Sequence, residues 1–156
     1  MTDLNRSALL MVPVELAFAV VNDILKYPEF LPGCDNVELL EIQTGDDPQS
    51  TIKARVDVGA KGMSYSFITR NAWVVNQSIE MFLEEGPFEV LEGIWTFKAL
   101  SDQGCRIDLS LNFVVKGLLS GLFSPIANSV ADRMVDAFTQ RIQAVRDIYI
   151  VSDDDN

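Results

Sequence analysis

The sequence predicts a single α+β domain in which a curved antiparallel sheet of about seven strands wraps around a long C-terminal helix. The length of 156 residues fits one domain of ordinary size. Between about Val37 and Val115 the apolar residues alternate with a period of two, as in half-buried strands joined by short loops. After Pro125 they recur every three or four residues, as in an amphipathic helix. A sheet with one apolar face needs a cover, and this helix supplies it.

A strand and two short helices are expected first. Residues 6–12 are predicted as the first strand, and Pro13 suits the first turn of a helix, where its missing N–H costs nothing. The stretch 27–34 holds two prolines and one glycine, so it predicts a short second helix and a turn. The apolar face of the first helix is expected to consist of Val14, Ala17, Phe18, Val21 and Leu25.

Six further strands follow from the alternation. It is clearest over residues 51–58, 78–83, 91–98 and 108–115, where one face is apolar and the other polar. Turn residues gather at 45–48, 59–62, 76, 86–87 and 102–104. Short loops between successive strands imply an antiparallel meander.

The last element is a helix of about 25 residues with Ser124 as N-cap and Pro125 in its first turn. Strand, two short helices, six strands and a long helix is the order of the helix-grip fold. The expected boundaries are 1–150 for this domain and 151–156 for an acidic disordered tail. The apolar stripe of the helix is predicted to contain Ile126, Val130, Met134, Ala137, Phe138, Val145 and Tyr149.

Composition excludes several classes of function. The chain has no histidine, which removes Ser-His-Asp and Cys-His nucleophilic sites and histidine-ligated metals. Twelve Lys and Arg against 23 Asp and Glu give a net charge of −11, which disfavours DNA as a partner. Cys34 and Cys105 are too few for a disulfide framework or a four-thiolate metal site, and we expect both to be reduced. No apolar run approaches the ~20 residues of a membrane span, so we expect a cytoplasmic protein. We also expect it to hold no metal or cofactor.

Two features allow more than one interpretation. The inward phase of the sheet is bulky and almost uncharged, which fits either a packed core or an apolar ligand pocket. Residues 117–123 fit either a packed loop or a lid that touches a membrane surface. Arg55 and Arg70 fall on the outward phase and leave Tyr65 and Thr69 as inward polar groups, so we expect no enzymatic activity. The apolar inward set is Phe67, Met81, Leu83, Leu91, Trp95, Phe97, Leu111 and Phe113, facing Met134 and Phe138.

Residues 27–34, Tyr-Pro-Glu-Phe-Leu-Pro-Gly-Cys, carry a family resemblance. They are similar to the YPxFLPxC motif of the coenzyme Q-binding START-like proteins and of the bacterial ribosome association toxin RatA family, within the polyketide cyclase-dehydrase-like superfamily. The similarity continues through residues 67–71, 79–83 and 86–97, Cys105 and residues 134–138. Gly33 departs from the family pattern, since many members carry tryptophan there, and a smaller residue would change the tunnel mouth.

The resemblance implies a START or Bet v 1-like helix-grip fold with an internal hydrophobic tunnel. By motif, Tyr27, Pro28, Phe30 and Leu31 would shape the tunnel entrance. Head-group contacts are expected from Asn71, Thr69 or Tyr65. The lining is expected to include Phe67, Met81, Leu83, Phe88, Leu91, Trp95, Phe113, Met134 and Phe138.

Two functions follow from this resemblance. The leading hypothesis is binding and shielding of ubiquinone or a related isoprenoid lipid in support of respiration, with transient contact at the inner membrane surface. The alternative is a ribosome-associated translation inhibitor that binds the large subunit and blocks subunit association. The acidic net charge places lipid binding first, because binding to ribosomal RNA favours a basic groove.

Overall fold

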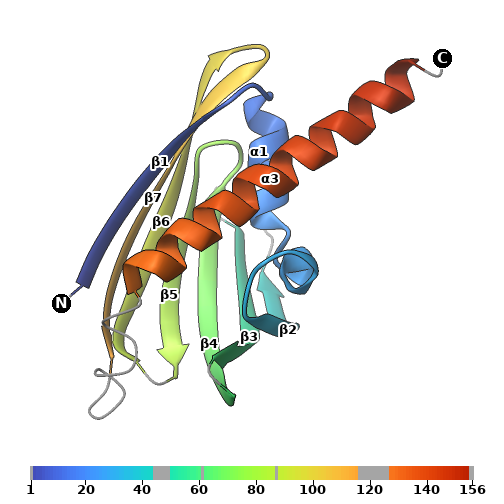
Figure 1. The fold of residues 1–156 in the computed structure, drawn as a ribbon. Coiled ribbons are helices and arrows are strands. Elements are labelled where there is room, and N and C mark those ends of the chain that lie inside the picture. Colours follow the sequence, from blue (N-terminus) through green and yellow to red (C-terminus); the bar gives the residue numbers. More distant parts are fainter. Residues whose placement is uncertain (1, 44–49, 61, 87, 116–126, 155–156) are drawn as a thin grey trace.

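The computed structural model describes residues 2–43, 50–60, 62–86, 88–115 and 127–154. The chain begins with a strand, a helix and a short 3₁₀ helix, continues with six strands and finishes with a long helix (Figure 1). The elements are β1 (Thr2–Leu10), α1 (Val14–Asn22), η1 (Ile24–Glu29), β2 (Cys34–Gln43), β3 (Ser50–Ala60), β4 (Met63–Val74), β5 (Ser78–Glu85), β6 (Phe88–Ser101), β7 (Gly104–Val115) and α3 (Ala127–Asp154).

The seven strands form one antiparallel sheet in the order β1-β7-β6-β5-β4-β3-β2. Every strand from β2 to β7 pairs with its neighbours in sequence, as the predicted meander requires. Strand β1 instead pairs with β7, with Thr2 opposite Phe113 and Leu10 opposite Cys105. The number of strands, their pairing and the order of the helices confirm the predicted helix-grip architecture.

All the helices lie against one face of the sheet, which we call the inner face. Figure 1 shows α3 crossing this face diagonally, with α1 and η1 on the same side. Helix α3 contacts β1 and α1, α1 contacts β6 and β7, and η1 contacts β2. Because the strands alternate, the apolar phase of each strand points toward these helices.

The buried apolar side chains form three clusters, and Tyr27 packs against two of them, the main and the η1 cluster. The main cluster joins α1 and α3 to the sheet and includes Val12, Val21, Ile107, Phe138 and Ile142. The strand cluster consists of Leu4, Leu91 and Phe113, with Phe67, Leu83 and Leu111 packed against it. The η1 cluster consists of Ile24, Val37 and Ala54, with Tyr27, Cys34, Leu39, Ile52 and Val56 around it.

The boundaries differ from the expectation at three places. Strand β1 starts at Thr2 rather than Arg6, because its pairing with β7 extends to that end. Leu25 is not on the buried face of α1: that helix ends at Asn22, and Leu25 is 49% exposed in η1. Helix α3 continues to Asp154, into the stretch expected to be an acidic tail, while Ser124 and Pro125 lie outside the described residues.

Two glycines are required by the backbone around them. Gly33 has φ of +79°, in the left-handed region that favours glycine, and its carbonyl accepts a hydrogen bond from the N–H of Gly59 at 2.9 Å. Gly86 lies in the β5–β6 connection, where a Cβ would stand 2.6 Å from the Cβ of Phe67. A side chain at either position would strain the turn that it closes.

Candidate functional site

Four aromatic rings meet where η1 packs against α3. The ring of Phe138 lies at centroid distances of 5.2 Å from Tyr27, 5.3 Å from Phe30 and 5.0 Å from Trp95. All three contacts are edge-to-face, the geometry that aromatic quadrupoles favour. The Tyr27 hydroxyl donates to the carbonyl of Val21, and burial raises the pKa of this phenol. Tyr27 therefore stays protonated and links η1 to the end of α1.

Arg141 of α3 adds two contacts to this junction between η1 and α3. Its guanidinium lies 5.3 Å from the centroid of the Phe30 ring and forms an ion pair with Glu29 at 3.1 Å. Pro28 and Leu31 are half-buried beside these residues. The motif of residues 27–34 thus has a clear structural role, since it docks η1 onto α3 at one border of the inner face.

A second group of the predicted lining residues lies in and around the strand cluster. Leu91 and Phe113 are buried in the strand cluster, and Phe67 and Leu83 are half-buried around them. Phe88 lies in β6, but its side chain is outside the described residues. The predicted residues therefore gather in two places: around Phe138, where Met134 and Trp95 also lie, and in the strand cluster.

Thr69 and Asn71 lie between these two places, on the inner face of β4. They are the buried polar side chains of the described part of the chain, with exposures of 3% and 8%. Thr69 is paired with Leu83 of β5 and Asn71 with Met81, both half-buried. Neither Thr69 nor Asn71 titrates, so this interior offers hydrogen bonds and no buried acid, base or cation.

One buried residue of α3 does not appear in the predicted stripe. Ile142 is completely buried in the main cluster, one helical turn after Phe138. Its position four residues from Phe138 is the signal that identifies it, because residues i and i+4 share a helix face. Residues 117–123, expected to be either a packed loop or a lid, lie outside the described residues. The role of the predicted site residues in ligand binding stays a prediction.

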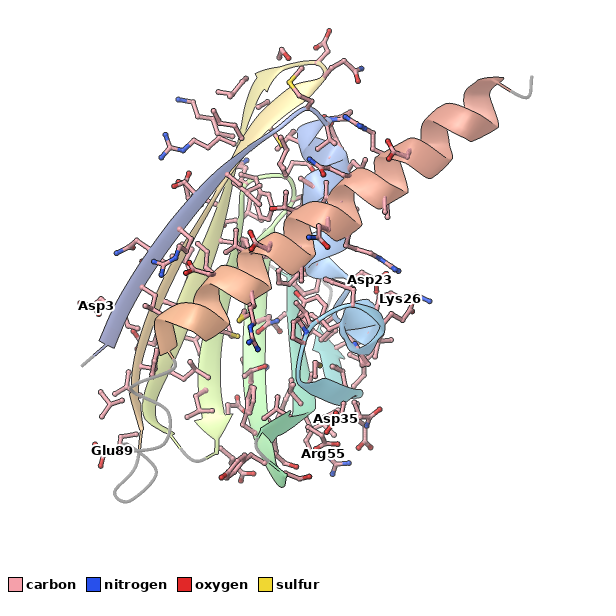
Figure 2. All side chains as sticks on the ribbon, in the orientation of Figure 1. Asp3, Asp23, Lys26, Asp35, Arg55 and Glu89 are labelled. Atoms are coloured by element: carbon pink, nitrogen blue, oxygen red, sulfur yellow. The ribbon has the colours of Figure 1, made fainter. Side chains whose placement is uncertain are left out.

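Ion pairs cover the outer face of β2, β3 and β4. Glu84 forms ion pairs with Lys53 at 3.0 Å and with Arg70 at 2.8 Å. Arg70 forms a second ion pair with Glu41 at 3.7 Å. Arg55, labelled in Figure 2, lies on the outward phase as predicted. It pairs with Glu38. Hydrogen bonds from Arg70 and Lys53 lower the pKa of Glu84, because they favour its charged form.

Replacing Glu84 by glutamine should reduce stability in a pH-dependent manner. Since the folded pKa of Glu84 lies below the unfolded one, its contribution is present above the unfolded pKa and disappears as the pH falls through the folded pKa. Urea unfolding of wild type and Glu84→Gln should therefore differ at pH 7, and the difference should shrink as the pH falls below the ordinary range of a glutamate. A difference that persists unchanged at the lower pH would contradict the ion-pair explanation.

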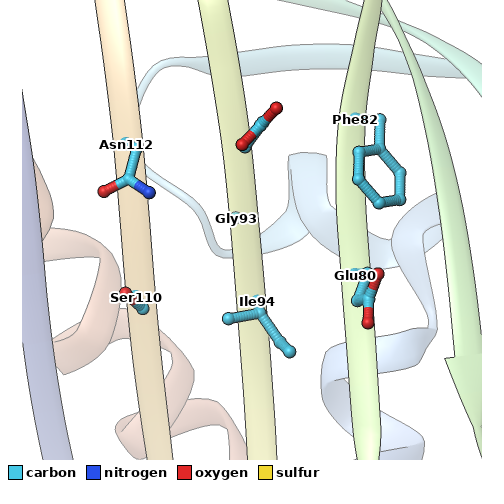
Figure 3. A pocket seen from close by; sticks show the side chains of 7 residues that line it. Glu80, Phe82, Gly93, Ile94, Ser110 and Asn112 are labelled. Carbon is cyan, nitrogen blue, oxygen red and sulfur yellow. The ribbon is translucent and has the colours of Figure 1, made fainter. Parts of the chain in front are cut away.

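Two depressions open on the sheet within the described residues. The first, of about 220 Å³, lies on the outer face of β5, β6 and β7 (Figure 3). The second, of about 180 Å³, lies where β5 and β6 stop pairing beyond Phe82 and Glu92. The first is lined by Glu80, Phe82, Glu92, Gly93, Ile94, Ser110 and Asn112. Its outward-facing lining, which includes the carboxylates of Glu80 and Glu92, distinguishes it from the apolar interior that the sequence predicts as a ligand site.

The two thiols are free and poorly reactive. Cys105 is completely buried and Cys34 half-buried. Burial, with Asp35 and Asp57 nearby, raises the pKa of the Cys34 thiol to about 11, so little thiolate forms at neutral pH. Among the helices of the described part, none combines the length and hydropathy needed to cross a membrane.

Comparison with known proteins places this fold and sequence in a family. The model of the family described as "Polyketide cyclase / dehydrase and lipid transport" matches residues 10–139. Solved structures with the same fold include a START superfamily protein from Mycobacterium smegmatis, with a TM-score of 0.75 and 21% identity over 92% of this chain and 98% of that one. The Zhui aromatase/cyclase from Streptomyces has a TM-score of 0.72 and 20% identity over 91% and 93% of the two chains.

Sequence relatives are closer than these structures. The ribosome association toxin RatA of Pseudomonas aeruginosa is 43% identical over 90% of this chain and 94% of its own length. The protein of that name from Escherichia coli K12 is 40% identical over 93% and 89%. A mitochondrial coenzyme Q-binding protein COQ10 homolog B from Xenopus laevis is 25% identical over 88% of this chain and 56% of its own. The chain therefore belongs to the polyketide cyclase/dehydrase and lipid transport family and, within it, to the group of proteins named ribosome association toxin RatA.

Proposed function

We propose that this protein associates with the ribosome and reduces the association of its two subunits. The observation that carries this proposal is the 43% identity with a ribosome association toxin over nearly the full length of both chains. The coenzyme Q-binding relative is 25% identical and is matched over 56% of its length. This reverses the order inferred from composition, in which quinone binding came first.

The charge distribution limits how such a contact is made. Eight cationic side chains of the described part already lie beside an acid, and Lys98 and Arg133 stand outside these ion pairs. The paired residues are Arg6, Lys26, Lys53, Arg55, Arg70, Arg106, Arg141 and Arg146. With a net charge of −11, the protein has few free cations for phosphates. We therefore expect contact with a basic ribosomal protein or with very few phosphates.

Sedimentation of ribosomes tests both statements. Adding the purified protein to separated subunits from its native host should lower the fraction that reassociates, in proportion to the protein added. The salt dependence of its affinity for the large subunit should be limited by the few cations outside ion pairs. Even if Lys61 and Lys116 also reach phosphates, four contacts give a slope of about −3 to −4 in log K against log[salt]. Unchanged reassociation would contradict the function, whereas a much steeper slope would contradict the charge argument alone.

Lipid binding is the second candidate, and a separate observation favours it. The matched family includes lipid transport, and several large apolar residues on the inner face remain only half-buried. Among them are Phe67, Met81, Leu83, Leu111 and Met134. Complete cores bury such residues, so their exposure suits a hydrophobic ligand such as ubiquinone or another isoprenoid lipid.

Mass spectrometry of the protein purified under mild conditions from its native host tests this candidate. Stoichiometric quinone in the extract would establish the lipid role and make ribosome binding secondary. An empty extract from folded protein would count against it. We propose no enzymatic activity, because the buried polar groups, Thr69 and Asn71, supply no acid or base. We place the protein in the cytoplasm, with transient contact at the membrane surface when it exchanges lipid.

A further inference from the structure

Thr69 and Asn71 form a polar pair inside an otherwise apolar inner face. They are two residues apart on β4, so their side chains project from the same face of the sheet. On the same face of β4 they are flanked by Phe67, which packs against the strand cluster, and by Trp73, which packs against the main cluster. The polar pair therefore lies between these two clusters along β4.

The amide of Asn71 lacks the partner that burial demands. Its Oδ1 is buried and accepts no hydrogen bond, and the residue is 8% exposed. Burying a polar atom without a partner is unfavourable, and most buried polar atoms in proteins are paired. A leucine at this position would have the same branched skeleton without that cost. A ligand that supplies the missing partner explains why an amide is present.

Apolar side chains that can repack around a ligand lie beside this pair. Asn71 is directly opposite Met81, and Met81 is opposite Gly93 of β6. The methyl of Met81 and Cδ1 of Leu111 fill the place of the missing side chain at Gly93, each 3.1 Å from where its Cβ would stand. Methionine is flexible and repacks easily around different shapes. Thr69 is likewise opposite Leu83, another half-buried apolar residue.

We propose that Thr69 and Asn71 bind the head group of a neutral amphiphile whose apolar tail lies along Met81 and Leu83. This inference rests on the lipid-binding function proposed above and specifies the orientation of the ligand. An amide and a hydroxyl can each donate and accept hydrogen bonds, so the head group carries carbonyl or hydroxyl oxygens. A charged head group is disfavoured, because the buried polar side chains offer it no opposite charge.

Two probes of equal length separate recognition of the head group from recognition of the tail. Decylubiquinone has ring oxygens, and n-undecylbenzene has none. Quenching of Trp73 and Trp95, which pack in or against the main cluster, gives the affinity for decylubiquinone. The affinity for n-undecylbenzene follows from its competition with decylubiquinone, measured as recovery of the fluorescence. Wild type should bind decylubiquinone at least about tenfold more tightly, as one buried hydrogen bond allows.

The variants Asn71→Leu and Asn71→Ala should each remove this preference, and Thr69→Val should reduce it. Asn71→Leu should melt at the wild-type temperature or above, because it removes an unpartnered buried oxygen. Thr51→Val is the matched control. Thr51 Oγ1 is also buried without a partner, but it lies on the opposite face of β3 from Ile52 and Ala54. This control should keep the full preference for decylubiquinone.

Each of the remaining outcomes would contradict the inference, and one of them would also contradict the lipid role. If wild type binds neither probe, the lipid role and the inference both fail. If wild type prefers decylubiquinone and both Asn71 variants keep that preference, the lipid role stands and the inference fails. A marked loss of stability in Asn71→Leu and Asn71→Ala together, with the preference intact, assigns the amide a structural role and overturns the inference as well.

Discussion

Replacing Phe138 by alanine should lower the free energy of unfolding by about 3 to 5 kcal/mol, the usual range for deleting a buried phenylalanine. Phe138 is 1% exposed, and its ring meets the rings of Tyr27, Phe30 and Trp95. The substitution removes contacts on η1, β6 and α3 at once and leaves a cavity between them. Urea unfolding followed by tryptophan fluorescence measures the loss.

Phe82→Ala is the matched control for this experiment. Phe82 lies on the outer face of β5 and is 42% exposed, so we expect a change within about 0.5 kcal/mol. If Phe138→Ala cost less than about 1 kcal/mol, η1 and α3 would not be held together by this aromatic contact.

Gly86→Ala should destabilise the protein by about 3 kcal/mol, as a combination of overpacking and backbone strain. The new Cβ would stand 2.6 Å from the Cβ of Phe67 and 3.2 Å from Cδ1 of Leu83. The first of these atoms is fixed directly to the backbone of β4, so rotation of a side chain cannot relieve the contact. The β5–β6 connection or β4 has to move.

Gly62→Ala separates the two causes of that loss. Gly62 has φ of +78°, and nothing lies within 4 Å of a Cβ built on it. Its replacement should therefore cost only the backbone contribution of about 1 kcal/mol. Equal losses for Gly86→Ala and Gly62→Ala in urea unfolding would show that contact with Phe67 has no effect.

Much of this fold could be predicted because the spacing of apolar residues differs between half-buried strands and amphipathic helices. The alternation over residues 51–58 or 91–98 is set by which side of the sheet faces water, and both strands lie where it places them. The end of α1 was harder to predict from the sequence. Leu25 continues the helical spacing in sequence, but the chain turns into η1 after Asn22, and only the tertiary packing of Ile24 and Tyr27 determines that turn.

The candidate site was harder to predict than the fold. Sequence phase places Phe67, Met81 and Trp95 on one face, yet it contains no measure of the distance between them. The structure separates Trp95, in the cluster around Phe138, from Phe67, which packs against the cluster around Phe113, with Thr69 and Asn71 between. Nor does a pattern reveal that Tyr27 and Phe30 pack edge-to-face on α3, because their partner is more than a hundred residues away.

The pairing of β1 with β7 determines when this protein can fold during its own synthesis. Strand β1 leaves the ribosome before its partner β7, since Thr2 pairs with Phe113 and Leu10 with Cys105. The ring of Phe138, which contacts Trp95, is translated later still. A nascent chain that stops before α3 therefore exposes the inner face to proteases and chaperones.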